Sequence, residues 1–315
     1  MSRLAGELRA KGHDVISLSL GEPDFDTPQH IKDAACQALK DGYTKYTPVP
    51  GLLELREAIC QKLKNENGLD YQPSQIVVSN GAKQTISNLA MALLNPGDEV
   101  ILLTPYWVSY YDIAGVAQGV PIAVAGGIEQ DYKVTPEQLE AAITPKTKYV
   151  LFSSPCNPTG SVYTKDELQG MADVIKKHEN LLIVSDEIYE YINFSGEHHS
   201  IAQCEGMEDR VIVVNGFSKG YSMTGWRLGY MAAPQWLATA CSKIQSQCTS
   251  GATSFGQKAA IAALEGDKSE TNLMRDTYLR RKVIMRDALN NIPGVKANDP
   301  QGAFYIFPDV SSYFG

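Results

Sequence analysis

Several side chains that can carry out group-transfer chemistry stand directly after short apolar runs of this 315-residue sequence. They are the primary amine of Lys219, the carboxylate of Asp186, the phenol of Tyr189, the carboxamide of Asn157, the indole of Trp107 and the guanidinium of Arg227. A lysine amine can form a Schiff base with an aldehyde, and a carboxylate can pair with a protonated ring nitrogen. The stretch Gly81, Ala82 and Lys83 reads as a helix start, whose free backbone amides bind phosphate. This combination fits pyridoxal phosphate.

The sequence lacks the motifs of several competing chemistries. The patterns H-E-x-x-H, G-x-x-x-x-G-K-[ST] and G-x-G-x-x-G do not occur. The five histidines are dispersed apart from His198 and His199, which stand in a polar stretch. The six cysteines are far apart and show no C-x-x-C or C-x-x-H spacing. We therefore predict free thiols in a reducing compartment and no metal site.

Charge and hydropathy argue against two classes of partner. The formal net charge is −8, from 28 Lys and Arg against 36 Asp and Glu, and the basic residues are scattered. We therefore predict no binding to nucleic acid. No stretch approaches about 18 uninterrupted apolar residues, and the charged N-terminal residues include no apolar signal segment. The sequence thus predicts a cytoplasmic protein with neither a membrane span nor a signal peptide.

The elements that would position these side chains are strands that alternate with helices. From residue 76 onward, short β-branched runs alternate with helix-patterned segments, which is typical of a mostly parallel sheet covered by helices on both faces. The predicted strands are 76–79, 100–103, 121–124, 149–152, 181–184, 211–214 and 228–231. Because these runs are almost continuously apolar, we expect both faces of each strand to be buried. Ligands of such sheets bind at the carboxyl ends of the strands, where the polar residues above stand.

Local signals divide the rest of the chain. Capping boxes are predicted at residues 135–138 and 164–167, where a threonine precedes Gln or Glu by three positions. A long charged helix is predicted from about residue 269 to 291, and a new strand at 302–307. We expect an N-terminal segment of a small domain, a large cofactor-binding domain and the incomplete start of a C-terminal small domain. These three parts are residues 1–29, 30–268 and 269–315.

Three longer motifs occur in order along the chain. They are Asn-Pro-Thr-Gly at 157–160, Ser-Asp-Glu-Ile-Tyr at 185–189, and residues 218–230, which include Gly-Trp-Arg-Leu-Gly-Tyr. In this order and at these separations they resemble the signatures of class I aminotransferases, and the resemblance covers nearly the whole chain. Residues 20–28, residues 45–46 together with 55–58, and residues 104–110 further resemble the bacterial aspartate aminotransferase subgroup. The resemblance implies the α/β fold of pyridoxal-phosphate-dependent transferases of fold type I, with a mostly parallel seven-stranded sheet and a smaller α/β domain.

The resemblance implies a role for each residue around the cofactor. Lys219 would bind the cofactor aldehyde as a Schiff base and then move a proton between the substrate Cα and the cofactor. Asp186 would pair with the ring nitrogen, while Asn157 and Tyr189 would hydrogen-bond the ring oxygen. Trp107 would stack on the ring face. Simpler interpretations stay open for these positions, namely a turn aspartate or asparagine and core aromatic side chains.

Phosphate binding follows from the same resemblance. Arg227 and the backbone amides of Gly81, Ala82 and Lys83 would bind the phosphate. Tyr46 would reach the phosphate of the neighbouring subunit, so that the active site belongs to a homodimer.

Three residues would contact the substrate, namely Gly21, Trp107 and Asn157. Lys83 has a second candidate role on the distal carboxylate of an acidic substrate, although a lysine at a helix start is also commonly solvated.

The sequence departs from the family pattern at two places. Many relatives carry Ser three residues before the Schiff-base lysine, where this chain has Gly216, and Ser218 stands next to Lys219. The arginine that binds the substrate α-carboxylate in the family is expected beyond Gly315. We therefore expect the chain to be an incomplete copy of a longer enzyme.

The function that the resemblance implies is transamination. The amino group of an acidic amino acid, aspartate or glutamate, would move to a 2-oxo acid by a ping-pong mechanism. Alternatives of the same fold are a prephenate or aromatic aminotransferase, a carbon–sulfur β-lyase and an inactive fragment. A non-catalytic sensor would require an N-terminal DNA-binding helix-turn-helix, which residues 1–30 do not resemble.

Overall fold

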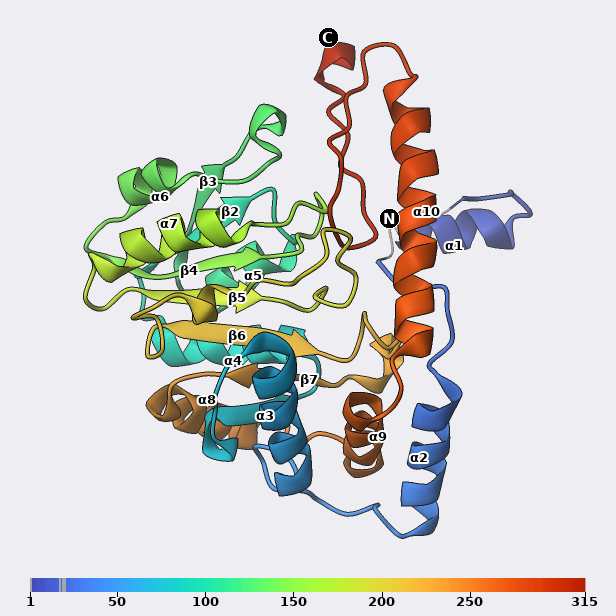
Figure 1. The fold of residues 1–315 in the computed structure, drawn as a ribbon, viewed down its shortest axis with the longest axis vertical. Helices are drawn as coiled ribbons and strands as arrows, with labels where there is room; N and C mark the ends of the chain where they lie inside the picture. The colour runs from blue at the N-terminus through green and yellow to red at the C-terminus, as the bar shows by residue number, and fades with distance from the viewer. Residues whose placement is uncertain (1, 17, 19–20, 315) are drawn as a thin grey trace.

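The computed structural model describes residues 2–16, 18 and 21–314 (Figure 1). Met1, Leu20 at the start of the 20–28 motif, and Gly315 lie outside the described residues. Within the described part of the chain, no helix combines the length and the apolar character needed to cross a membrane.

A seven-stranded sheet forms the centre of the fold. Its strands are β1 (Ile76–Ser79), β2 (Glu99–Thr104), β3 (Val120–Ala125), β4 (Thr147–Ser153), β5 (Leu182–Asp186), β6 (Val211–Gly216) and β7 (Gly229–Ala232). They lie in the order β1-β7-β6-β5-β4-β2-β3. The pairs from β6 to β3 are parallel, whereas β7 is antiparallel to both of its neighbours. Every predicted strand is present, with its ends within two residues of prediction, and the mostly parallel α/β fold is confirmed.

The prediction that every strand is buried on both faces is wrong for β3. This strand lies at the edge of the sheet and pairs only with β2. All its residues are at least partly exposed, and Val120 is 44% exposed. The opposite edge strand, β1, is buried throughout, so an edge position does not by itself expose a strand. Helices 53–67, 82–93 and 235–248 pack against β1, whereas the short helices 109–116 and 136–142 pack against β3 and cover it less completely.

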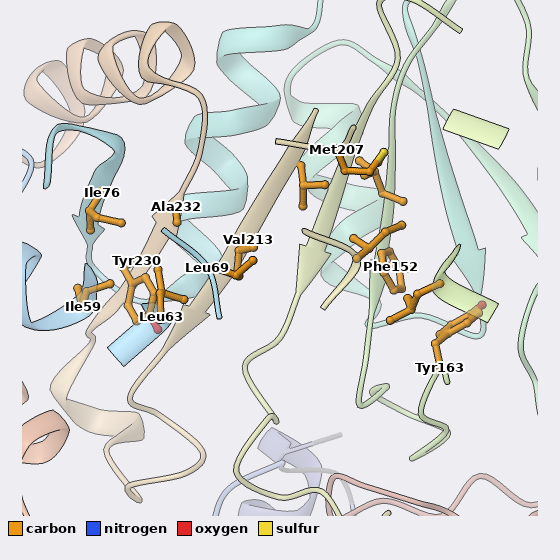
Figure 2. Packing of buried hydrophobic residues seen from close by; sticks show 14 of the residues in the cluster. Ile59, Leu63, Leu69, Ile76, Phe152, Tyr163, Met207, Val213, Tyr230 and Ala232 are labelled. Atoms are coloured by element: carbon orange, nitrogen blue, oxygen red, sulfur yellow. The ribbon is translucent and has the colours of Figure 1, made fainter. Parts of the chain in front are cut away.

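Helices cover both faces of the sheet (Figure 1). The helices of the described chain are α1 (Ser2–Ala10), α2 (Gln29–Lys40), α3 (Leu53–Asn67), α4 (Ala82–Leu93), α5 (Ser109–Val116), α6 (Pro136–Ala142), α7 (Lys165–Lys176), α8 (Gln235–Cys248), α9 (Ser254–Glu265) and α10 (Ser269–Asn290), of which α1 and α10 lie to one side of the sheet. Alternate strand side chains point to opposite faces. Ile183 therefore belongs to the core beneath α2, α3, α6, α7 and α9, while Val184 belongs to the core beneath α4, α5 and α8. Figure 2 shows part of the first core, where Leu63 of α3 lies beside Tyr230 of β7.

Both predicted capping boxes are confirmed. The Thr164 hydroxyl accepts from the Glu167 amide at 3.3 Å, and the Glu167 carboxylate accepts from the Thr164 amide at 2.8 Å. Thr135 and Gln138 make the same reciprocal pair at the start of α6. The predicted helix at 269–291 is α10, which ends one residue earlier. These helix ends agree with prediction because a cap depends on residues only three positions apart.

The predicted strand at 302–307 is wrong. Gly302 forms a single isolated bridge with Asn193, and residues 303–307 have no regular secondary structure. A strand requires a partner whose backbone pairs along its length. Among the described residues, that bridge is the only β-type backbone pairing of residues 302–307. The segment is therefore an irregular loop.

A third apolar cluster joins four distant parts of the sequence. Phe25, Tyr278 of α10 and Phe304 pack with the loop that follows β5, which contributes Ile188 and Tyr189. In Figure 1, α10 stands at one side of the sheet beside the segment that leads to the C-terminus. The predicted domain limits after residues 29 and 268 stay a prediction.

Candidate active site

A cavity of about 750 Å³ opens at the carboxyl ends of the parallel strands. Nine of the eleven residues that sequence reasoning placed in the site line it, namely Gly21, Ala82, Lys83, Trp107, Asn157, Asp186, Tyr189, Lys219 and Arg227. Gly81 stands beside it, because a Cβ there would lie 2.3 Å from an Arg227 guanidinium nitrogen. Tyr46 does not line it and is 97% exposed. The loops after strands therefore bring together residues that are up to about 200 positions apart, as open parallel sheets do.

The amine of Lys219 is held inside the cavity, on the turn that follows β6. Its Nζ donates to the Gly21 carbonyl oxygen at 2.5 Å and lies 5.8 Å from the Tyr189 ring centre. Burial lowers the pKa of Lys219 to about 8, although the Glu22 carboxylate opposes this shift. Burial disfavours the charged form of an amine. A substantial neutral fraction, which is the nucleophilic form, is therefore present close to neutral pH.

The turn after β6 also matches the G-x-S-x-G pattern in which a histidine activates a serine, at residues 216–220. His198 bonds the Glu187 carboxylate at 2.9 Å. No histidine of the described chain hydrogen-bonds the Ser218 hydroxyl. The geometry therefore favours the Lys219 amine as the nucleophile.

Asp186 ends β5 and presents a buried carboxylate to the cavity. Its Oδ2 accepts from the Tyr110 hydroxyl at 2.6 Å, and its Oδ1 accepts from the Ile188 amide at 3.2 Å. Burial raises the pKa of Asp186 to about 6, while the hydrogen bond from Tyr110 works in the opposite direction. A buried carboxylate without a cationic partner attracts a positively charged or proton-donating group. Asp186 can therefore hold the protonated nitrogen of an aromatic ring.

Tyr189 and Asn157 share a partner that sequence reasoning missed. The Tyr305 hydroxyl lies 2.7 Å from the Tyr189 hydroxyl and accepts from Asn157 Nδ2 at 3.5 Å. No local signal marks Tyr305, because it lies in the irregular 302–307 segment. Tyr110 was also missed, although its place three residues after Trp107 in the first turn of a helix could have identified it. The two aromatic rings meet edge to face with centres 5.6 Å apart.

The start of α4 forms a cradle for an anion. Gly81 adopts φ +84°, a left-handed conformation that favours glycine. The amides of Ala82 and Lys83 donate to no acceptor among the described residues, and the guanidinium of Arg227 lies against Gly81. Free amides at a helix start and a guanidinium both bind phosphate.

Two facing glycines allow this helix start to approach the sheet. Gly216 of β6 is in register with Gly229 of β7. A Cβ on Gly229 would lie 2.3 Å from the Ala82 nitrogen, and a Cβ on Gly216 would lie 2.8 Å from the Gly229 Cα. A serine side chain at position 216 would therefore require a shift of the β6–β7 pair.

The side chains of Lys83 and Trp107 contact each other in the cavity lining. The Lys83 ammonium lies 4.7 Å from the centre of the Trp107 ring, and both residues line the cavity. This contact holds a positive charge over a flat aromatic surface. The two side chains can thus contact both a planar ring and an anionic group.

Comparison with known proteins agrees with this geometry. A family model described as aminotransferase class I and II matches residues 13–313. The chain belongs to this family. The aminotransferase is 49% identical to the aspartate/prephenate aminotransferase of Cereibacter sphaeroides over 313 residues, which are 99% of this chain and 78% of that protein.

Solved structures show the same fold. The aspartate aminotransferase of Rhizobium meliloti is 41% identical, with a TM-score of 0.97, and the match covers 100% of this chain and 79% of that one. The Thermus thermophilus aspartate aminotransferase with maleate is also 41% identical, with a TM-score of 0.95, over 99% and 81% of the two chains. The amine, the buried carboxylate and the anion cradle fit the aldehyde, ring nitrogen and phosphate of pyridoxal phosphate, the cofactor that the sequence resemblance implies.

Proposed function

We propose that this aminotransferase binds pyridoxal phosphate in the cavity and moves the amino group of an acidic amino acid to a 2-oxo acid. The observation that carries the proposal is the joint placement of the Lys219 amine, the Asp186 carboxylate and the α4 anion cradle in one cavity. Each group matches a different part of the cofactor.

The residues that would hold the cofactor follow from their chemistry. Lys219 would bind its aldehyde, and Asp186 its ring nitrogen. Arg227, with the amides of Ala82 and Lys83, would bind its phosphate. When bound, pyridoxal phosphate supplies an electron-accepting ring that stabilises negative charge at the substrate Cα.

Tyr189 and Asn157 would hydrogen-bond the ring oxygen, and Trp107 would cover one ring face. Gly21 and Asn157 would contact the substrate. A Cβ at position 21 would lie 2.1 Å from the Tyr305 hydroxyl oxygen, so any residue other than glycine there would displace the Tyr305 side chain.

Lys219 would also handle the proton of the reaction. An amine with a pKa of about 8 is partly neutral near pH 7. In that form it can take a proton from the substrate Cα and would then deliver it to the cofactor. Its burial in the cavity limits exchange of that proton with solvent. The same residue therefore supports both halves of a ping-pong transfer.

Lys83 supports the choice of an acidic substrate. Its ammonium lines the cavity and can pair with a second carboxylate. The similar Thermus enzyme is solved with maleate, a dicarboxylate. Prephenate is the second candidate, since the Cereibacter relative bears that name and the cavity has aromatic walls. Product analysis with aspartate, prephenate and cystathionine as donors or acceptors would separate these activities and the β-lyase alternative.

A covalent label tests the cofactor site. The purified chain is mixed with pyridoxal phosphate, reduced with borohydride and digested, and the modified peptide is identified by mass. We expect one pyridoxyl group, on Lys219, because its amine has a larger neutral fraction than an exposed lysine and lines the cavity. The Lys219→Ala variant should take up none at that peptide, and the exposed Lys40 serves as an internal control. Labelling spread over many lysines would contradict the proposal.

We also propose that the enzyme is a homodimer in which Tyr46 acts on the neighbouring site. The support is the full exposure of its phenol outside its own cavity. A cytoplasmic location stays a prediction.

A further inference from the structure

The loop after β5 has two sides. Asp186, Ile188 and Tyr189 line the cavity, whereas Glu187 and Glu190 do not. Both glutamates are nevertheless buried, with side chains that are 1% and 5% exposed. The proposed reaction uses neither of them. A buried carboxylate needs partners that satisfy its charge.

Glu187 is fully bonded on the side away from the cavity. Its Oε2 lies 2.9 Å from His198 Nε2. Its Oε1 accepts from the Ser185 hydroxyl at 2.9 Å and from the Ser200 hydroxyl at 2.6 Å. Burial works against a charged imidazole, but the Glu187 carboxylate outweighs it and raises the pKa of His198.

Glu190 is paired with a lysine of a different element. Lys62 of α3, whose side chain is 2% exposed, forms an ion pair with Glu190 Oε1. Asn67 joins both, because its Oδ1 accepts from Lys62 Nζ at 2.7 Å and its Nδ2 donates to Glu190 Oε2 at 3.2 Å. Burial alone would raise the pKa of Glu190, yet Lys62 and His198 hold it below its usual range.

These residues do not form a metal site, although their spacing allows one. Ligand atoms of Glu187, Glu190 and His198 lie within 4.8 Å of one another. The Lys62 ammonium already contacts Glu190, and it would repel a divalent cation at that point. The net charge of the cluster is already close to zero, because the Lys62 ammonium and His198, whose pKa is raised, offset the two carboxylates.

We infer that Lys62, Glu187, Glu190 and His198, here called the rear cluster, are positioning residues for the active site. They tie the 186–190 loop to α3, so that Asp186 and Tyr189 face the cavity at fixed positions. The inference rests on the proposed function, because it assigns those two side chains to the cofactor.

The loop has two local backbone hydrogen bonds, from the Glu190 amide to the Glu187 carbonyl at 2.9 Å and from the Ile192 amide to the Tyr189 carbonyl at 2.8 Å, and neither joins it to α3. β5 ends at Asp186, and the following residues are in turns. The Glu187 amide still donates to the Val214 carbonyl of β6 at 2.8 Å, which fixes the start of the loop. Beyond that point the Lys62 contact to Glu190 joins the loop to a helix anchored in the core, and Tyr189 stands directly before Glu190. Loosening such a supporting contact displaces the side chains that it orients.

The test uses the double variant Lys62→Met/Glu190→Met. Removing one partner alone would leave a buried charge unpaired and destabilise the fold, whereas apolar replacement of both partners is often tolerated. We expect the double variant to unfold at a temperature close to that of the wild type. We expect its affinity for pyridoxal phosphate, measured by quenching of tryptophan fluorescence, to fall about tenfold.

A spectroscopic readout separates positioning from mere stability. The absorbance of the bound cofactor is titrated with pH. A phenol that donates to the ring oxygen stabilises its deprotonated form. If Tyr189 is displaced, the midpoint of this titration moves to higher pH. Unchanged affinity and an unchanged midpoint in a folded double variant would overturn the inference.

A matched control and a second variant complete the design. Lys258→Met/Glu54→Met removes a 2.6 Å ion pair between α9 and α3 that does not line the cavity, and both readouts should stay unchanged.

If the first double variant does not fold, His198→Gln keeps a neutral donor to Glu187 and should move the midpoint in the same direction. An unmoved midpoint in that variant would count against the inference. A wild-type chain that binds no cofactor would instead overturn the proposed function together with this inference.

Discussion

Burial in the cavity shifts two ionisable groups in opposite directions. It lowers the pKa of Lys219 to about 8 and raises the pKa of Asp186 to about 6. The cause is the same, because removal from water disfavours an ammonium and a carboxylate alike. Between these two values Asp186 is largely ionised and Lys219 has a growing neutral fraction. The Lys219 amine and the Asp186 carboxylate are thus prepared for covalent binding and for ring pairing near neutral pH.

Tyr110 limits the shift of Asp186, which gives a testable pH dependence. In Tyr110→Phe the hydrogen bond to Asp186 Oδ2 is lost, so the pKa of Asp186 should rise further above about 6. The ring nitrogen requires the ionised carboxylate, and cofactor binding is lost as the pH falls through this pKa. We expect the loss to begin at higher pH in the variant, measured by equilibrium binding of pyridoxal phosphate from pH 5 to about 8.

The neighbouring Tyr111→Phe provides the control for that experiment. Tyr111 is 53% exposed and does not line the cavity. Its binding profile should coincide with that of the wild type. If the wild type, Tyr110→Phe and Tyr111→Phe all gave the same binding profile, the Tyr110 hydrogen bond would not affect the pKa of Asp186.

The start of α4 packs directly against the backbone of strand β7. Gly229 lets the Ala82 nitrogen come so close that any side-chain carbon at position 229 would overlap it. The free amides of the helix start therefore sit against the sheet and beside Arg227. The anion cradle depends on how two elements pack as well as on the residues that line it.

Gly229→Ala tests this packing. Its Cβ would lie 2.3 Å from the Ala82 nitrogen and 2.7 Å from the Gly81 carbonyl carbon, and backbone atoms cannot move aside easily. We expect a loss of roughly 1–3 kcal/mol in the free energy of unfolding, measured with urea, together with weaker binding of pyridoxal phosphate.

Gly115→Ala in α5 is the matched control. Nothing lies within 4 Å of its added Cβ, so the variant should be more stable by about 0.5–1 kcal/mol and bind the cofactor normally. If Gly229→Ala behaved like Gly115→Ala, the close approach of α4 to β7 would be contradicted.

Distant parts of the chain close around the cavity. Phe25 near the N-terminus, Tyr278 of α10 and Phe304 form one apolar cluster against Tyr189. An ion pair of 2.8 Å between Arg281 and Asp24 joins the same segments. The cavity is therefore a property of the folded chain as a whole, and loss of any of these segments would expose Tyr189.

The proposed dimer makes the site a property of two chains. If Tyr46 serves the neighbouring site, a chain with Lys219→Ala and a chain with Tyr46→Ala can together form one intact site. We expect coexpressed variants to show transaminase activity when each alone shows little, measured with aspartate and 2-oxoglutarate.

Pairing Lys219→Ala with Asp186→Ala should recover nothing, because both residues belong to the same cavity and each site then lacks one of them. Equal activity in the two mixtures would argue against a shared site.

Local patterns were sufficient for much of the fold and for most of the site. Apolar runs marked the seven strands, and the residues that follow strand ends, such as Asp186 and Lys219, were found because parallel strands place those ends at one edge. The capping box at Thr164 depends on residues three positions apart. Each of these features is encoded in short stretches, so it can be read without knowledge of the rest of the chain.

Packing between distant segments decided the remainder. Four features depend on segments that lie far apart in the sequence. They are the edge position of β3, the irregular course of 302–307, the contact of Tyr305 with Tyr189 and the pairing of Lys62 with Glu190. A strand forms only if a partner backbone is present, and a buried charge persists only beside its counter-charge. Both conditions depend on where other segments lie in space, which is why they became visible only in the folded structure.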